Sequence, residues 1–170
     1  MILTHLDKLV LQSPSAIALG FFDGVHLGHQ AVIGRAVAHR EEGLAPSVFT
    51  FTMGAEGPAG KRGHTYLMTP EERYASMERL GVEQIFCPDF SQFRGMSPRE
   101  YVEELLVGRL RAKVVCCGED HHFGRDAAGD VTLLRELCGP LGVRVEVVPP
   151  VLLEDGSRVS SSAIRAALRE

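Results

Sequence analysis

The sequence predicts an α/β protein built on a doubly wound, mostly parallel sheet with helices on both faces. Short apolar runs typical of buried strands alternate along the chain with amphipathic stretches of helical periodicity, and this alternation indicates βαβ units. Glycine-rich polar segments directly follow two of the apolar runs. They therefore belong at the carboxyl ends of strands, where sheets of this class bind their ligands.

The predicted elements follow one another along most of the chain. The strands are expected at Ala16–Phe21, Pro46–Phe51, Glu83–Cys87, Lys113–Cys117 and Val143–Val148, and the helices at Gly28–Glu42, Thr69–Leu80, Ser97–Leu110 and Asp130–Cys138. Thr69 and Ser97 mark helix starts, since each offers an N-cap hydroxyl followed by proline and, three residues on, glutamate. The glycine-rich segment Thr52–His64 is expected to be a loop that orders when a ligand binds.

Length and composition indicate one globular domain that spans residues 1–170. The chain is 45% hydrophobic and 24% charged, which are ordinary values for a globular protein. Its net charge of −4 argues against a protein that binds duplex DNA. No stretch approaches the roughly 18 apolar residues that cross a bilayer, and the first residues lack a signal-peptide pattern. We expect no nucleic acid and no membrane among its partners.

The four cysteines indicate the compartment. They form no CxxC pair, and Cys116 and Cys117 lie inside the apolar run "KVVCCG". Such cysteines are typical of buried thiols in a reducing compartment. We therefore expect a cytoplasmic protein.

The segment "GFFDGVHLGH" follows the first long apolar run and leads into a predicted helix. Gly20 and Gly24 can adopt backbone angles closed to other residues, and Gly28 allows a ligand to approach closely. His26 and His29 are three residues apart at the helix start, so both rings can face one side. Free backbone N–H groups and the helix macrodipole favour a phosphate there.

Other interpretations of this segment have less support from the sequence. A dinucleotide-binding turn has the spacing GxGxxG, whereas these glycines follow GxxxGxxxG. A zinc site needs a third and a fourth ligand at fixed spacing, and no nearby cysteine or carboxylate supplies them. A helix-pairing GxxxG surface is excluded because the segment is short and polar. A role in phosphate binding is favoured over a purely structural one.

A second polar cluster, "CGEDHHFGRDAAGD" (Cys117–Asp130), follows the fourth predicted strand. Gly118 ends that strand, and Asp120 follows at the same edge of the sheet. Arg125 adds a cation that stays charged at cellular pH. A solvated loop would explain this composition by itself, but the position beside the first cluster favours a function.

A third cluster lies near the C-terminus in "RVSSSAIRAALRE". Ser160, Ser161 and Ser162 precede a helical pattern, and Arg165 lies on its first turn. Hydroxyls, free N–H groups and a guanidinium together make a second anion site. Two anion sites on one domain suggest that a polyphosphate lies between them.

The three clusters, in this order, resemble the nucleotidyltransferase superfamily, whose HxGH signature is here His26-Leu27-Gly28-His29. More narrowly, "GFFDGVHLGH", "VVCCGEDHHFGR", "AGDVTLLREL" and "VSSSAIRAAL" resemble the adenylyltransferase module of prokaryotic bifunctional riboflavin kinase/FAD synthetases. The resemblance implies a Rossmann-like nucleotidyltransferase fold and the reaction FMN + ATP → FAD + pyrophosphate with Mg²⁺. It also implies direct displacement, in which the FMN phosphate attacks the α-phosphorus of ATP.

The resemblance implies roles for individual residues. His26 and His29 would contact the ATP phosphates, while Ser161, Ser162 and Arg165 would hold the departing β/γ end. It assigns no metal ligand, although Asp23 would help to place the metal and the phosphates. The substrate-binding positions that it implies are Gly20, Phe21, Asp23, Gly24, Gly28, Gly118, Asp120, Phe123, Arg125, Ser160 and Ser162.

The chain departs from the family pattern in two segments. Phe51 is followed by "TMGAEGP" where the family has a "TFxPHP"-like segment, and "SSAIR" stands where the family has "STRIR". Two alternatives therefore stay open: a nucleotidyltransferase with another phosphorylated acceptor, such as a phosphopantetheine-like or sugar-type phosphate, and a non-catalytic ATP-binding remnant. Because the chain stops at Glu170, we expect no riboflavin kinase domain, and a separate riboflavin kinase if the chain is full length.

Overall fold

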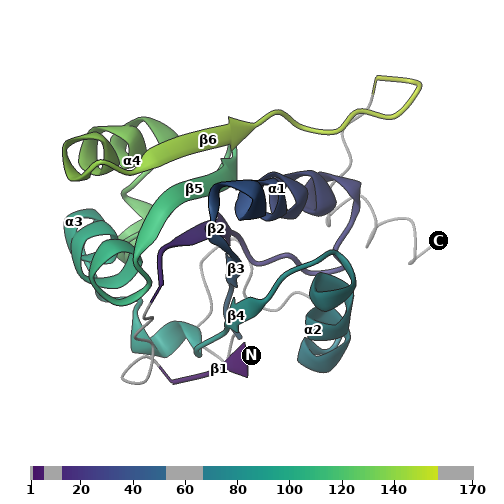
Figure 1. The fold of residues 1–170 in the computed structure, drawn as a ribbon, viewed down its shortest axis with the longest axis horizontal. Helices are drawn as coiled ribbons and strands as arrows, with labels where there is room; N and C mark the ends of the chain where they lie inside the picture. The colour runs from purple at the N-terminus through teal and green to yellow at the C-terminus, as the bar shows by residue number, and fades with distance from the viewer. Residues whose placement is uncertain (1, 6–12, 53–66, 157–170) are drawn as a thin grey trace.

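The computed structural model describes residues 2–5, 13–52 and 67–156 of the chain. In these residues, six parallel strands form one sheet with the order β1-β4-β3-β2-β5-β6 (Figure 1). The strands are β1 (Ile2–Leu3), β2 (Ser15–Leu19), β3 (Ala45–Phe49), β4 (Gln84–Phe86), β5 (Ala112–Gly118) and β6 (Arg144–Val148). The predicted α/β class with a parallel sheet is confirmed.

Helices cover both faces of the sheet, as Figure 1 shows. The helices are α1 (Leu27–Ala38), α2 (Pro70–Arg79), α3 (Pro98–Glu100) with its continuation Tyr101–Arg109, and α4 (Val131–Cys138). One face packs Ile33 of α1 and Met77 of α2 against the strands. The other face packs Leu105 and Leu134. The sheet is therefore doubly wound, as predicted.

Both helix starts that the sequence marks are confirmed. The Thr69 hydroxyl accepts a hydrogen bond from the Glu72 N–H at 3.1 Å, and Ser97 forms a capping box with Glu100. These side chains satisfy N–H groups that have no partner inside the helix.

The predicted helix Ser97–Leu110 differs from expectation in its winding. It is α-helical only over Pro98–Glu100 and continues as a π-helix over Tyr101–Arg109. The wider turn is visible at its end, where the Leu110 N–H donates to the Leu105 carbonyl at 3.0 Å. The sequence did not show this because the spacing of its buried apolar residues is compatible with an α-helix and with a π-helix.

Strand ends differ from the prediction by one or two residues. The first strand ends at Leu19 instead of Phe21, and the next ends at Phe49 instead of Phe51. The edge strand β1 was not predicted at all, because two residues are too short to show an alternating pattern. It pairs Ile2 with Ile85 of β4.

The order of the strands places the first two polar clusters side by side. From β2 the chain moves to β3 and β4 on one side, and then returns to β5 on the other side of β2. The carboxyl ends of β2 and β5 are adjacent, with Ala18 paired with Cys116. Such a switch point is where open parallel sheets bind their ligands.

The cysteines behave as the sequence predicts. All four are unpaired and buried, and burial is the main reason that the pKa of Cys117 and that of Cys138 are each raised to about 11. Cys117 and Cys138 therefore stay protonated and unreactive at neutral pH. Within the part of the chain that the structure describes, no helix has the length and apolar character to cross a membrane.

Two glycine substitutions test the backbone. Gly34 is exposed in α1, and a Cβ there would meet nothing within 4 Å. We expect Gly34→Ala to raise the free energy of unfolding by about 0.5–1 kcal/mol, since alanine is the better helix former and restricts the unfolded chain. Gly124 has a φ of +80°, and its Cβ would lie 2.9 Å from Pro98. Gly124→Ala should therefore lower the free energy of unfolding. Urea unfolding measures both changes. Equal stability of the two variants would contradict this account.

Candidate functional site

The loop after β2 carries the first cluster on a strained backbone. Phe22 has a φ of 57° and Val25 a φ of 39°, and both side chains are buried. Positive φ is unfavourable for bulky and β-branched residues and persists where the surroundings enforce it, commonly at functional sites. In the described residues the non-glycine positions with positive φ are Phe22, Val25, Arg111, Asp126 and Ala127. Four of these five lie in the loops after β2 and β5.

His26 caps the N-terminus of α1 with its own side chain. Its Nδ1 accepts hydrogen bonds from the backbone N–H of Gly28 at 3.0 Å and of His29 at 3.3 Å. Two of the N–H groups that the sequence suggested for a phosphate are therefore occupied by the imidazole. An accepting Nδ1 puts the proton of the neutral ring on Nε2. Burial lowers the pKa of His26, which favours this neutral form at neutral pH.

The rings of His26 and His29 face one side, as predicted. They stack with centroids 3.6 Å apart and an angle of 18° between the planes, and both side chains are partly exposed. Behind them the ring of Phe22 meets His29 edge-on at 5.2 Å. A Cβ at Gly20 would lie 2.8 Å from the Phe22 ring. Glycine at position 20 therefore allows the Phe22 ring to hold His29 in place.

Asp23 secures the same loop from beneath. Its carboxylate is 1% exposed and accepts hydrogen bonds from the backbone N–H of Leu67, at 2.8 and 2.9 Å, and of Met68, at 3.0 Å. These contacts join the loop to the segment before α2. Gly24 has a φ of +85°, and its Cβ would lie 2.8 Å from Leu67. A role of Asp23 in placing a metal and phosphates stays a prediction.

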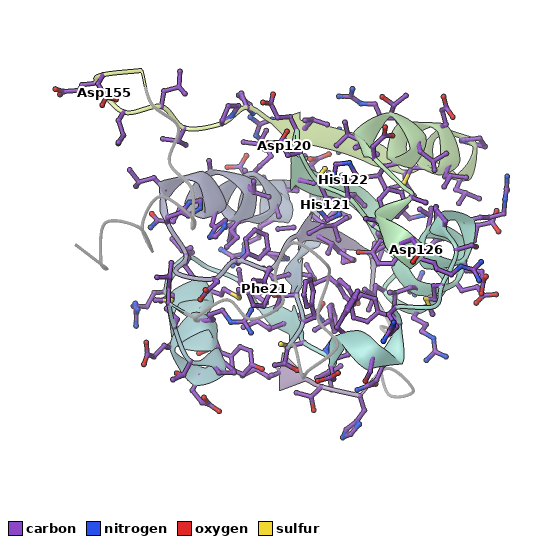
Figure 2. The ribbon with its side chains drawn as sticks, turned by 180° about the vertical axis from the view of Figure 1, so that it is seen from behind. Phe21, Asp120, His121, His122, Asp126 and Asp155 are labelled. Atoms are coloured by element: carbon purple, nitrogen blue, oxygen red, sulfur yellow. The ribbon has the colours of Figure 1, made fainter. Side chains whose placement is uncertain are left out.

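The second cluster lies at the end of β5, where Figure 2 labels Asp120, His121 and His122. A Cβ at Gly118 would meet nothing within 4 Å, so there is open space above the strand end. Asp120 is exposed, and its carbonyl accepts a hydrogen bond from His122 Nδ1 at 2.8 Å. The geometry leaves room for a ligand beside polar groups.

Two predicted binding residues of this loop occupy different environments. Phe123 is buried in the core and stacks on the His121 ring at 6.1 Å. It supports the loop from inside. The Arg125 side chain is exposed, while its backbone N–H donates to the Met96 carbonyl at 2.6 Å. The structure thus brings Gly20–His29 and Gly118–Arg125 to one edge of the sheet.

Part of the predicted site lies outside the described residues. This applies to Ser160, Ser161, Ser162 and Arg165, and to the loop from residue 53 onward. Their predicted roles stay predictions.

Sequence reasoning missed an aromatic group at the carboxyl ends of β3 and β4. Phe51 stacks on Phe21 with centroids 5.0 Å apart and lies 5.5 Å from Phe90 and 5.9 Å from Phe93. The rings of Phe51, Phe90 and Phe93 are partly exposed. A signal was present, since Phe51 and Phe90 each end or closely follow a predicted strand. Partly exposed aromatic rings offer faces on which a flat ligand can stack.

A buried cation, Arg73 of α2, was also missed. It is 3% exposed, and its guanidinium donates to the Phe21 carbonyl at 2.7 Å, the Thr50 hydroxyl at 3.0 Å and the Phe51 carbonyl at 3.2 Å. It also lies over the Phe21 ring, 4.8 Å from the centroid. Arg73 thereby joins the chain segments that follow β2 and β3. An arginine on an amphipathic helix gives no sequence signal of burial.

Metal-ligating residues gather elsewhere. In the described residues, one group of three such side chains is found, formed by His39, Cys116 and Glu146. His39 follows the C-terminal end of α1, at the opposite end of the helix from His26.

The doubly wound sheet and the polar loops at its switch point define the class of protein. It is an α/β protein whose polar loops gather at the carboxyl ends of β2 and β5.

The particular family follows from comparison of the sequence. The profile of the FAD synthetase family matches residues 9–163, and the chain belongs to this family. A bifunctional riboflavin kinase/FMN adenylyltransferase of Bacillus subtilis is 34% identical over 98% of this chain and 54% of its own length. An FAD synthetase of Listeria monocytogenes is 30% identical over 91% of this chain and 63% of its own length. The chain thus spans about half to two thirds of these curated relatives.

A solved structure agrees with the fold. The crystal structure of a protein described as a macrolide-efflux protein from Streptococcus pneumoniae superposes with a TM-score of 0.81 at 30% identity. The match covers 98% of this chain and 55% of the other. The predicted family resemblance is therefore confirmed.

The cap formed by His26 can be tested by two substitutions. His26→Ala should lower the free energy of unfolding by about 1 kcal/mol, because two helix N–H groups lose their acceptor. His26→Asn should lower it less, since asparagine is a good N-cap. The folded-state pKa of His26 lies below the usual 6.5. The contribution of His26 to the free energy of unfolding is therefore present above pH 6.5. It is lost as the pH falls through the pKa that His26 has in the folded protein. The His26→Asn variant should not lose stability over this pH range, because asparagine does not titrate there. Urea unfolding of the wild type and of this variant at several pH values measures the difference. The same pH dependence in the two proteins would contradict the prediction.

The buried guanidinium can be tested in the same way. Arg73→Met should lower the free energy of unfolding by about 2 kcal/mol, since the Phe51 carbonyl loses a charged donor. The free energy of unfolding of Arg73→Lys should lie between those of the wild type and Arg73→Met, because one ammonium cannot reach all three acceptors. Arg79→Met, exposed on the same helix, is the control and should stay within about 0.5 kcal/mol of the wild type. An Arg73→Met protein as stable as this control would show that these bonds contribute little.

Proposed function

We propose that this chain transfers AMP from ATP to FMN, giving FAD and pyrophosphate. The observation that carries the proposal is the stacked pair of imidazoles of His26 and His29 at the N-terminus of α1. The pair lies at the switch point of the sheet, next to the open space above Gly118. Imidazole donors at a positive helix end suit the phosphates of a nucleotide.

The proposed reaction is a direct displacement. An oxygen of the FMN phosphate attacks the α-phosphorus of ATP, and a new P–O bond forms. The bond between the α-phosphorus and the oxygen that bridges to the β-phosphorus breaks, and its electron pair leaves with pyrophosphate. The attacking phosphate is already ionised at neutral pH, so no nucleophilic side chain is needed. Catalysis then rests on alignment and on stabilising the charge that moves to pyrophosphate.

His26 is suited to the second task. Because Nδ1 is held by the amides of Gly28 and His29, the Nε2–H is available to donate to a phosphate oxygen. His29, held by Phe22, would donate beside it. We retain for Ser161, Ser162 and Arg165 the role of holding the departing end of ATP.

The remaining substrate groups have candidate positions. The adenosine would lie over Gly118, near Asp120, and the flat isoalloxazine ring would stack on the aromatic rings of Phe51, Phe90 and Phe93. This aromatic group supports a flavin acceptor although the segment after Phe51 departs from the family pattern. Mg²⁺ would arrive bound to the ATP phosphates, which are its usual ligands in such reactions.

The proposal concerns adenylyl transfer by a single domain of 170 residues. Riboflavin phosphorylation, which the names of several relatives include, is not proposed for these residues. We propose a cytoplasmic location, in keeping with the four buried, unpaired cysteines.

Pyrophosphate release from Mg-ATP should depend on FMN. The assay compares FMN, riboflavin and no acceptor, and identifies FAD by chromatography. His29→Ala should lower turnover by about 10²–10³, the usual loss when one donor to a developing charge is removed. His5→Ala, which removes an exposed histidine beside the edge strand β1, should leave turnover unchanged.

Two outcomes would overturn the proposal. Turnover with another phosphorylated acceptor but not with FMN would mean that the acceptor is not a flavin. Binding of ATP without pyrophosphate release for any acceptor would identify a non-catalytic nucleotide-binding protein.

A further inference from the structure

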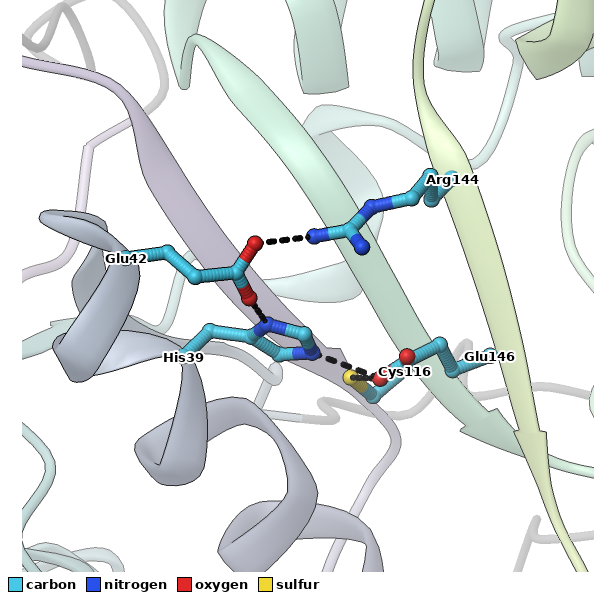
Figure 3. Close-up of polar contacts among 5 residues, drawn as sticks. All are labelled: His39, Glu42, Cys116, Arg144 and Glu146. Atoms are coloured by element: carbon cyan, nitrogen blue, oxygen red, sulfur yellow. Dashed lines mark hydrogen bonds and ion pairs between the residues drawn. The ribbon is translucent and has the colours of Figure 1, made fainter.

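Five side chains form a polar cluster around His39, at the opposite end of α1 from His26 (Figure 3). His39 lies in the 3-10 turn after α1, Cys116 in β5 and Glu146 in β6. Their ligand atoms, one nitrogen, one sulfur and one oxygen, all lie within 4.8 Å of one another. Three segments far apart in the sequence thus direct three metal-binding atoms to one point.

Two of the three distances between the ligand atoms can be compared with those of a tetrahedral metal site. Zinc bonds of about 2.0–2.3 Å place neighbouring ligand atoms about 3.3–3.8 Å apart. Cys116 Sγ lies 3.8 Å from Glu146 Oε1, which fits without movement. His39 Nε2 lies 2.7 Å from the same oxygen. This pair needs to open by less than about 1 Å to admit a cation.

The burial of the three residues suits a bound ion. Cys116 is fully buried and His39 is 8% exposed, so two ligands are held by the packing of α1 against the sheet. The Glu146 side chain is 26% exposed, which gives a cation and one water molecule access from solvent. Three protein ligands and one water complete a tetrahedral set.

The second ring nitrogen of His39 is already oriented. Nδ1 is hydrogen bonded to the Glu42 carboxylate, and the other oxygen of Glu42 accepts from Arg144 Nη2 at 2.7 Å. A carboxylate on the far side of the ring holds Nδ1, so that Nε2, which contacts Glu146, faces the proposed metal position, and it makes the imidazole a stronger ligand. This arrangement is typical of histidines that bind zinc.

We propose that His39, Cys116 and Glu146 bind a Zn²⁺ ion, with Glu42 and Arg144 orienting His39. Zinc accepts mixed nitrogen, sulfur and oxygen ligands, whereas Mg²⁺ and Ca²⁺ prefer oxygen alone. On binding, the thiol of Cys116 and the Nε2–H of His39 each give a proton to solvent; the sulfur then bonds to the metal as a thiolate and Nε2 bonds through its lone pair. No electron is transferred, since zinc has no redox chemistry under these conditions.

The ion acts as a structural staple in this proposal. His39 follows His26 by thirteen residues, about 20 Å along the helix at about 1.5 Å per residue, so the metal does not reach the imidazole pair. It ties the C-terminal end of α1 to β5 and β6. The cation would therefore act on the stability of the fold and not on the reaction.

Cobalt provides the direct test. The chain of residues 1–170 is stripped with a chelator, dialysed and titrated with Co²⁺, which reports tetrahedral ligation by visible bands and thiolate ligation by a near-ultraviolet charge-transfer band. We expect one Co²⁺ per chain with both signals. Added Zn²⁺ should displace it, abolish the colour and raise the unfolding temperature.

Variants assign the ligands. Cys116→Ser should lose the charge-transfer band, whereas Cys117→Ser, one residue on and buried in the core on the other face of the sheet, should keep it. Glu146→Gln, at a partly exposed position, should weaken binding at least about tenfold without disturbing the core, and Glu42→Gln should weaken it about 10–100-fold while the band remains. Circular dichroism checks that each variant is folded.

The opposite results would overturn the proposal. These are a wild-type protein with no charge-transfer band, equal zinc affinity of the wild type and the Cys116→Ser variant, or loss of the band in the Cys117→Ser variant as well. In the first case the cluster would be an ion-pair network around His39 that binds no metal, and in the other two the metal would be bound without Cys116 as its specific ligand.

Discussion

The pairing of β2 with β3 on one side and β5 on the other is the constraint on which the rest of the structure depends. Because parallel strands end at the same edge, this pairing brings the loop after β2 beside the loop after β5. The sequence separates these loops by about ninety residues, yet both contain the polar groups and most of the positive φ angles of the described residues. The sheet therefore determines where the site lies, and the loops determine its chemistry.

The strained loop after β2 is held by buried polar groups rather than by its own backbone preference. Asp23 fixes it through the amides before α2, and Arg73 fixes the strand ends beside it. Each of these groups is expensive to bury unless its hydrogen bonds are made. Such fully bonded groups tolerate little movement, which preorganises the imidazole pair. The hydrogen bonds of residues that do not face the ligand space thus offset the unfavourable backbone angles of this loop.

How much of this could be predicted from the sequence depends on the kind of signal. The fold class, the helix caps at Thr69 and Ser97, and the shared edge of the first two clusters follow from local patterns, and all are confirmed. The burial of Arg73, the π-helical turn after Glu100 and the meeting of His39 with Glu146 do not. They arise from contacts between distant segments, and neither periodicity nor spacing records such contacts.

Helix α1 connects the two ends of this arrangement. At its start the His26 ring satisfies the helix amides and presents its other nitrogen outward. At its end His39 contacts Glu146 of β6 and lies beside Cys116 of β5. A helix that is fixed at one end only can pivot about that end. A helix that is fixed at both ends keeps the direction of its axis relative to the sheet. The orientation of the His26 and His29 rings is therefore a property of the whole β2-α1-β5-β6 layer, and the contacts at the far end of α1 help to hold the end that carries these two rings in place.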